Sequence, residues 1–298
     1  MSSRTFTKIA LLAGVLALLV PLVASAGGYR TSSAGKSSHT RSHALARTLD
    51  AVKRTLFATD SAGNLLQFRG ITPQLARSQQ ITGLPAGVTL KGIDFRPATG
   101  DLYALGSDKV VYRVNPQTAI AVAEGPAFET SAAALTGDRI GFDFNPTVDK
   151  IRVTSDADDN IRLDPDPGSL LATDTKLNPA DVTVVGSAYT NSSFAAFANR
   201  PATTTLYAYD TSGSQDRIHV QNPPNAGTLV TPKSLRIDLG TDVGFDIAGS
   251  DDVGYVAGTP RGESDAQLYV VDVTSGDTRR LGRIGRGVTI TGLAAWQS

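Results

Sequence analysis

One short motif recurs along the chain at spacings of 45 to 58 residues, and this repeat restricts the possible folds more than any other feature. Three strong copies place an aspartate two positions after a glycine, and they span Lys91–Pro97, Ile140–Pro146 and Val243–Ile247. Two weaker copies keep the glycine without the aspartate, at Val185–Tyr189 and Thr291–Ala295. Repeats of this length, rich in short strands, predict a β-propeller with one blade per copy.

Each strong copy is followed by further apolar segments that predict a second, a third and a short fourth strand. The second strand is centred eleven positions after the glycine, at Tyr103, Arg152 and Tyr255. The same segment follows Gly186 only after 21 positions, which predicts an insertion around Asn191–Thr203. Four strands per repeat is the composition of a propeller blade.

The two ends of the repeat region supply complementary parts of one blade. The last copy, Thr289–Trp296, provides a first strand and nothing after it. The segments Thr55–Thr59, Asn64–Arg69 and Arg77–Thr82 have the pattern of a second, third and fourth strand. We therefore predict an all-β, five-bladed β-propeller closed by pairing of the C-terminal strand with the N-terminal blade. Two separate β-sandwich domains remain the alternative, but they do not explain the regular spacing.

Three stretches of the chain resemble a bacterial family of exported proteins designated domain of unknown function 4394. They are Gly141–Val153, Asn160–Pro165 and Gln221–Leu229, and the resemblance extends over about residues 54–296. The resemblance implies a secreted repeat domain. It carries no activity and no catalytic or binding residue. The run Asp156–Asp159 is more acidic than the family pattern leads us to expect.

The N-terminus has the pattern of an export signal, and we predict a signal peptide over residues 1–26. Arg4 and Lys8 precede the apolar run Ile9–Val23, and Ala24–Ala26 fits a cleavage site. A membrane anchor is the alternative, but the run is shorter than the ~20 residues that span a bilayer. Residues 27–49 are predicted to be a flexible basic tether and residues 50–298 a single propeller domain. We expect a secreted or periplasmic protein with no membrane span after cleavage.

Composition excludes several classes of site. The chain has no cysteine, so disulfides, thiolate metal sites and cysteine nucleophiles are excluded. The first 49 residues carry six basic residues and no acid, which leaves 22 basic against 28 acidic residues in the body. A negative body argues against nucleic acid as a partner. His39 and His43 lie in the predicted tether, where a solvated spacer is a better interpretation than a metal site.

The aspartates of the three strong copies, Asp94, Asp143 and Asp246, are the candidate ligand-binding residues. The first strand of a blade lines the central channel, where glycosidases place paired carboxylates. The alternative that we favour is structural: each carboxylate accepts backbone N–H groups at the following proline turn. Because the three positions are equivalent in the repeat, we expect alanine at each of them to have a similar effect.

Other candidate groups receive a structural interpretation. The run Asp156–Asn160 has oxygens at alternate positions, but it departs from a calcium loop, so weak calcium binding is the most that we expect. His219 lies in an apolar strand, and no nucleophile motif accompanies it. We interpret a basic cluster near the C-terminus as a solvated loop, and the recurrent aromatic residues and Trp296 as packing between blades. The cluster comprises Arg279, Arg280, Arg283 and Arg286.

These observations favour an exported propeller without enzymatic activity, acting as a ligand-binding or envelope scaffold protein. No catalytic residue, metal site or cofactor is assigned. The expected partner is a small molecule, a glycan or an envelope protein. The alternative function is a secreted hydrolase of glycans or lactones that uses the channel carboxylates.

Overall fold

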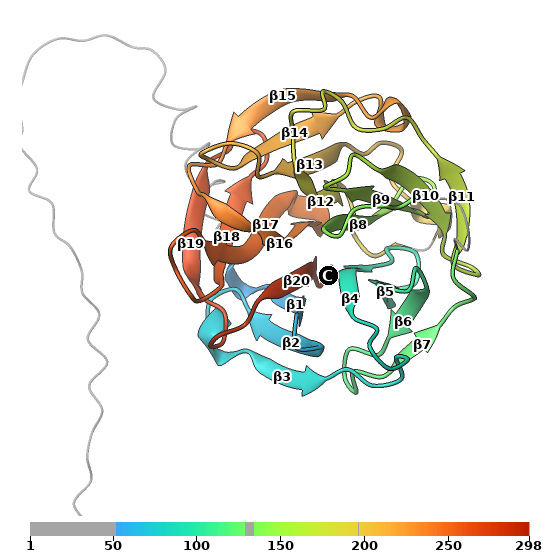
Figure 1. The fold of residues 1–298 in the computed structure, drawn as a ribbon, viewed down its shortest axis with the longest axis horizontal. Helices are drawn as coiled ribbons and strands as arrows, with labels where there is room; N and C mark the ends of the chain where they lie inside the picture. The colour runs from blue at the N-terminus through green and yellow to red at the C-terminus, as the bar shows by residue number, and fades with distance from the viewer. Residues whose placement is uncertain (1–51, 129–133, 196, 298) are drawn as a thin grey trace, which may run out of the picture. The chain divides into compact units, whose positions relative to one another are not determined.

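The computed structural model describes residues 52–128, 134–195 and 197–297. In these residues, twenty strands form five four-stranded antiparallel sheets that stand in a ring around a central axis (Figure 1). The predicted five-bladed β-propeller is therefore confirmed. The helices are single turns: η1 (Pro73–Leu75), η2 (Phe197–Asn199), η3 (Pro224–Ala226) and η4 (Gly249–Asp251). None of the helices found in the described part of the chain is long and apolar enough to span a membrane.

The strands fall into blades in the order of the chain, apart from β20. Blade 1 contains β20 (Ile290–Ala295), β1 (Thr55–Asp60), β2 (Asn64–Arg69) and β3 (Arg77–Gln80). Blade 2 contains β4 (Leu90–Phe95), β5 (Leu102–Gly106), β6 (Val111–Val114) and β7 (Ala121–Ala123). Blade 3 contains β8 (Ile140–Asn145), β9 (Lys150–Ser155), β10 (Asn160–Asp164) and β11 (Ser169–Thr173). Blade 4 contains β12 (Val184–Tyr189), β13 (Leu206–Asp210), β14 (Arg217–Gln221) and β15 (Leu229–Ser234). Blade 5 contains β16 (Leu239–Ala248), β17 (Val253–Pro260), β18 (Gln267–Asp272) and β19 (Thr278–Arg283).

The ring closes within blade 1, where strands from the two ends of the repeat region pair. Strand β20 is antiparallel to β1, with Leu56 opposite Ala295 and Ala58 opposite Leu293. The Trp296 backbone N–H extends the pairing by donating to the Thr55 carbonyl at 2.9 Å. This pairing gives β1 a partner along the edge that faces the axis and so removes an unpaired strand edge.

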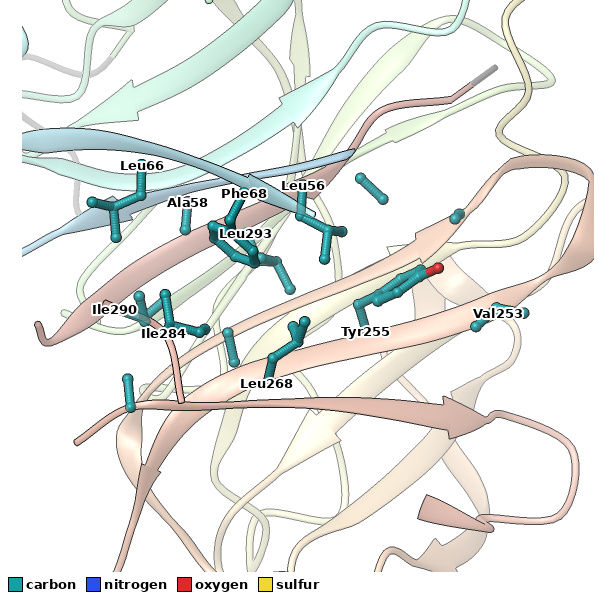
Figure 2. Packing of buried hydrophobic residues seen from close by; sticks show 14 residues of the cluster. Leu56, Ala58, Leu66, Phe68, Val253, Tyr255, Leu268, Ile284, Ile290 and Leu293 are labelled. Carbon is teal, nitrogen blue, oxygen red and sulfur yellow. The ribbon is translucent and has the colours of Figure 1, made fainter. Parts of the chain in front are cut away.

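Apolar side chains from neighbouring blades pack together and hold the ring. Between blades 1 and 5, Leu56, Phe68 and Leu293 pack in one cluster with Tyr255 and Leu268, and all five are buried (Figure 2). Aromatic side chains make similar contacts between other blades, as predicted. The Phe57 and Phe95 rings lie 5.4 Å apart, and the Tyr103 and Phe144 rings 5.2 Å apart.

Trp296 packs as predicted, and the predicted insertion also has its place. The Trp296 ring meets the rings of Phe95 and Phe194 edge-on, each at 4.9 Å. Phe194 belongs to the long connection between β12 and β13, which is the segment that the spacing of the repeat identified as an insertion. The predicted signal peptide and tether lie outside the described residues, and so do His39 and His43.

Candidate functional site

The five glycines of the repeat lie on the first strands of the blades, which surround the axis (Figure 1), and together they line one narrow space. A Cβ atom on Gly92 would lie 2.7 Å from the Phe142 Cβ, and one on Gly244 would lie 2.5 Å from the Leu293 Cβ. One on Gly141 would lie 2.3 Å from a backbone nitrogen of the next blade. Only glycine permits this approach, and the space left along the axis is about 10 Å³, roughly one water molecule.

The three candidate aspartates lie two positions beyond the glycines, on β4, β8 and β16. Asp94, Asp143 and Asp246 are only 1–2% exposed. One carboxyl oxygen from each lies within 4.8 Å of the others. The sequence therefore identified three residues from different blades that meet at the axis.

Each aspartate accepts a backbone N–H from the first strand of the next blade. Asp94 accepts from Phe144 at 2.8 Å, and Asp143 accepts from Tyr189 at 3.1 Å. Asp246 accepts from Ala295 on β20 at 2.6 Å, which ties blade 5 to the closing strand. The carboxylates therefore join consecutive blades at the axis.

Two blades lack the aspartate, and the N–H groups in the blades that follow them therefore need another acceptor. Ala188 and Ala294 occupy the equivalent positions of blades 4 and 1 and offer no side-chain acceptor to the blade that follows. In the blades that follow, blades 2 and 5, the backbone N–H at the same repeat position is accepted by the aspartate of its own strand, one residue earlier, in both cases at 2.6 Å. These two bonds run from Phe95 to Asp94 and from Ile247 to Asp246. Three carboxyl groups thus satisfy all five equivalent N–H groups.

The carboxyl groups of Asp143 and Asp246 also share a hydrogen bond. Burial raises the pKa of Asp143 well above its usual range, and the nearby charges of Asp94 and Asp246 raise it further. Burial raises the pKa of Asp246 to about 6, although the hydrogen bonds from the N–H groups of Ala295 and Ile247 act in the opposite direction and lower it. The shared bond raises the pKa of Asp143 and lowers that of Asp246, so Asp143 is the donor and Asp246 the acceptor.

Two sequence-based expectations about the aspartates need correction. The donors from the neighbouring blades lie on the first strands β8, β12 and β20 and not in the proline turns. The three positions are also not equivalent, because Asp94 and Asp246 each accept two N–H groups and Asp143 accepts one. Both errors arise because the bonds depend on which residue the preceding blade carries. The ligand-binding role of the three aspartates stays a prediction.

A cavity of about 230 Å³ opens at the mouth of the channel, before the first strands reach the glycines. Its floor is a ring of five residues that each precede a repeat glycine: Lys91, Ile140, Val185, Val243 and Thr291. Ser61, Thr89, Asp138, Arg139, Thr241 and Asp242 form much of the wall. Because the glycines close the axis below, this cavity is a cup with one opening.

The charged groups of the cup differ in their partners. The Arg139 Nε atom lies 3.2 Å from an Asp242 carboxyl oxygen, and Asp138 is exposed. The partly buried Lys91 has no hydrogen bond or ion pair with any residue that the structure describes. Sequence reasoning missed this cup. The available signal was that the residue before the glycine is lysine in one copy and aliphatic in three.

The three stretches that carry the family resemblance meet in a buried polar cluster between blades 3 and 4. Arg152 donates to Asn160 at 2.7 Å, to Asp174 at 2.6 Å and to Asn225 at 2.7 Å. Gln221 donates to Asn160 at 3.2 Å. Arg152 is 2% exposed, so the cluster has the geometry of a clamp between blades and not of a solvent-facing site.

The acidic run Asp156–Asn160 forms a hairpin turn between β9 and β10, as predicted. Asp156 and Asp159 accept backbone N–H groups from residues 136–139, at 2.6 to 3.2 Å. Burial alone would raise the pKa of Asp159, but the hydrogen bonds, among them one from Ser155, outweigh it and lower the pKa. The run therefore anchors the segment that leads to the mouth.

The remaining candidates are also held by structural contacts. His219 is buried on β14, and its Nε2 atom lies 3.0 Å from an Asp210 oxygen. Three members of the basic cluster, Arg279, Arg280 and Arg283, lie on the outer strand β19 and not in a loop, which corrects the sequence-based interpretation. Arg280 is balanced by Glu263 and Arg283 by Asp265, each at 3.2 Å.

Comparisons with known proteins complete the description. The family model described as a domain of unknown function, DUF4394, matches residues 64–294. No curated protein matches the chain.

Solved structures with a similar arrangement are only distantly related. TolB from Acinetobacter baumannii has 11% identity and a TM-score of 0.42, over 83% of this chain and 58% of that one. Hydrazine synthase from Kuenenia stuttgartiensis has 13% identity and a TM-score of 0.41, over 68% of this chain and 51% of that one. The chain therefore spans a little over half the length of these two proteins, and no activity follows from the likeness.

Proposed function

The chain belongs to the DUF4394 family of domains of unknown function, and from this premise we propose that it is an exported, non-enzymatic propeller that binds a small molecule at the mouth of its channel. One observation carries the proposal: a cup of about 230 Å³ keeps an unpaired lysine above an axis in which the polar groups are satisfied. Concave sites with a few convergent polar groups are the usual form of small-molecule sites.

The alternative function, hydrolysis of glycans or lactones, has one observation in its favour. The axial carboxyls approach within 4.8 Å, comparable with the ~5 Å separation in retaining glycosidases. Five of their six oxygens already accept backbone N–H groups, and the space beside them holds about one water molecule. A general acid or nucleophile must reach its substrate, so this geometry supports a structural role.

A ligand screen by thermal shift tests the binding proposal. The screen covers carboxylic acids, amines, polyols, glycans and divalent cations including Ca²⁺. We expect at least one class to raise the melting temperature with increasing concentration, because binding to the folded state stabilises it. The variant Thr241→Trp, which fills the rim of the cup, should abolish that shift. If no class raises the melting temperature, the binding proposal fails and the scaffold role remains.

An activity assay tests the alternative. Chromogenic glycosides and lactones are incubated with the protein and with Asp143→Asn, which keeps the shape of the side chain. We expect the same background rate for both proteins. Turnover by the unchanged protein that Asp143→Asn abolishes would support the hydrolase and contradict a non-enzymatic function.

Export is tested separately. The charged, apolar and small-residue pattern of the first 26 residues supports cleavage before Gly27. N-terminal sequencing of the protein from the culture medium and the periplasm should begin at Gly27. A sequence beginning at Met1 or Ser2 in those fractions would contradict the proposal.

A further inference from the structure

We propose that the ligand of the cup is a short aliphatic carboxylate, with its carboxylate at Lys91 and its hydrocarbon chain against Ile140 and Val243. This inference rests on the proposed function and specifies the class of molecule. It comes from the unequal distribution of charge and apolar surface around one ring of residues at the channel mouth.

The cationic side of the cup is set by Lys91. At the equivalent position before the repeat glycine, three other blades carry an aliphatic side chain and blade 1 carries Thr291. The side chain of this partly buried lysine has no partner among the described residues, so its ammonium group is available to a ligand. An anionic ligand supplies that partner. The hydroxyls of Ser61 and Thr89 line the same cavity and add hydrogen-bond donors, whereas the Thr291 hydroxyl already donates to Thr59 at 2.9 Å.

The apolar side of the cup is a continuous arc. Ile140 on β8 and Val243 on β16 line the cavity and are 6% and 5% exposed, and Val185 on β12, in the blade between them, is fully buried. Such an arc offers no hydrogen bonds to a sugar or a nucleotide base. It stabilises a ligand in proportion to the apolar surface that the ligand removes from water.

The acidic residues of the cup do not reverse this charge. Asp242 is paired with Arg139, at 3.2 Å. Asp138 is exposed, so solvent screens its charge. On the floor itself, Lys91 is the one charged member of the five-residue ring.

The size of the cup limits the length of the hydrocarbon chain. Its volume of about 230 Å³ lies below the ~300–1,000 Å³ typical of sites for drug-sized molecules. The glycine ring beneath leaves about 10 Å³, so a long chain cannot continue along the axis. Affinity should therefore rise with chain length and then fall once the chain no longer fits.

Isothermal titration calorimetry on the exported protein tests the inference. The ligands are acetate, butyrate, hexanoate and decanoate, each compared with the neutral primary amide of the same length. We expect the tightest binding for an intermediate length, and affinity at least about tenfold lower for the amide, because hydrogen bonds to charged groups are stronger than neutral ones. Lys91→Gln should reduce carboxylate affinity by a similar factor. Lys233→Gln, an exposed lysine on the outer strand β15, should leave it unchanged.

Other results overturn the inference. Equal affinity for acid and amide, unchanged affinity in Lys91→Gln, or no binding of any carboxylate would each do so. If another ligand class binds and Thr241→Trp blocks it, the proposed function stands and only the ligand class is wrong. If nothing binds in either experiment, the proposed function fails as well.

Discussion

The two levels of the central channel, the aspartates beyond the glycines and the cup before them, use polar groups in opposite ways. At the inner level, three carboxyl groups satisfy five backbone N–H groups, and two of the three carboxyls also share a hydrogen bond. At the outer level, a lysine interrupts an aliphatic ring and has no partner among the described residues. Residue positions that recur between blades therefore hold the ring together, whereas the position at which one blade departs from the others is the candidate for binding.

Removal of β20 should have the largest effect, because it destroys the inner level. Truncation after Gly287 takes away the partner of β1, the Ala295 donor to Asp246 and the Trp296 packing. We expect loss of the cooperative thermal transition, measured by far-ultraviolet circular dichroism. A truncated protein with an unchanged melting temperature would contradict closure through this strand.

The loss of unfolding free energy on replacing a single aspartate with alanine should depend on how many N–H groups that aspartate accepts. Asp246→Ala and Asp94→Ala each leave two buried N–H groups without an acceptor, at about 1–3 kcal/mol for each group. Asp143→Ala leaves one, so its loss of unfolding free energy should be about half as large. Urea unfolding curves measure the three values.

The amide variant Asp143→Asn is a matched control for the alanine variants. The pKa of Asp143 is raised well above its usual range by burial, and Asp143→Asn retains an acceptor that can also donate to Asp246. We expect no loss of unfolding free energy and, at neutral pH, a gain, because the amide is neutral without taking up a proton on folding. A loss for Asp143→Asn as large as that for Asp246→Ala would show that the Asp143 proton is not part of the bonding at the axis.

The axial carboxyls should make the protein less stable as pH rises. The pKa of Asp246 is raised from 3.8 to about 6, so the folded state binds more protons than the unfolded state in this interval. Stability should therefore be full below about pH 4 for this group and decrease as pH rises through about 6. Urea midpoints across this range measure the slope.

A control is needed for the pH experiment because burial also raises the pKa of Asp216 to about 6. The variant Asp143→Asn removes one of the axial titrating groups and leaves Asp216 unchanged. Its slope should be shallower than that of the unchanged protein. An identical slope would assign the pH dependence to groups outside the axis.

The smallest effect should come from the outer level. Lys91→Val makes the fourth aliphatic member of the ring at the mouth and removes a partly buried charge without a partner. We expect unchanged stability or a gain of up to about 1 kcal/mol in thermal unfolding, since sites shaped for binding are often not optimised for stability. A clear loss of stability would mean that Lys91 has a structural role, as the axial aspartates have, and would contradict a binding role for the outer level.

The sequence predicted the fold closely because a propeller repeats one local pattern. The glycine spacing located the first strands, and the complementary ends at Thr55–Thr59 and Thr289–Trp296 specified the closure that β1 and β20 make. The spacing also located the insertion between β12 and β13. These features depend on residues near one another in the chain or on a periodic arrangement, and both can be read without coordinates.

The site was less predictable because its contacts cross between blades. The sequence identified Asp94, Asp143 and Asp246, but the donor to each depends on whether the preceding blade carries aspartate or alanine. The cup is formed by single residues from five strands, and no local motif joins them. Arg152, Asn225 and their neighbours show the same limit, because motifs distinctive in sequence proved to be one cluster only in space.

The closure of blade 1 also has a kinetic consequence. Blades 2 to 5 pair strands that are neighbours in sequence, whereas Arg54 and Trp296, which a hydrogen bond joins beside the closure, lie 242 positions apart. Contacts of such high sequence separation form slowly, since the entropy of closing a long loop is lost before the contacts are made. The seam between β1 and β20 should therefore be the last to form during folding and the first to open under force, and the lifetime of the native ring depends on it.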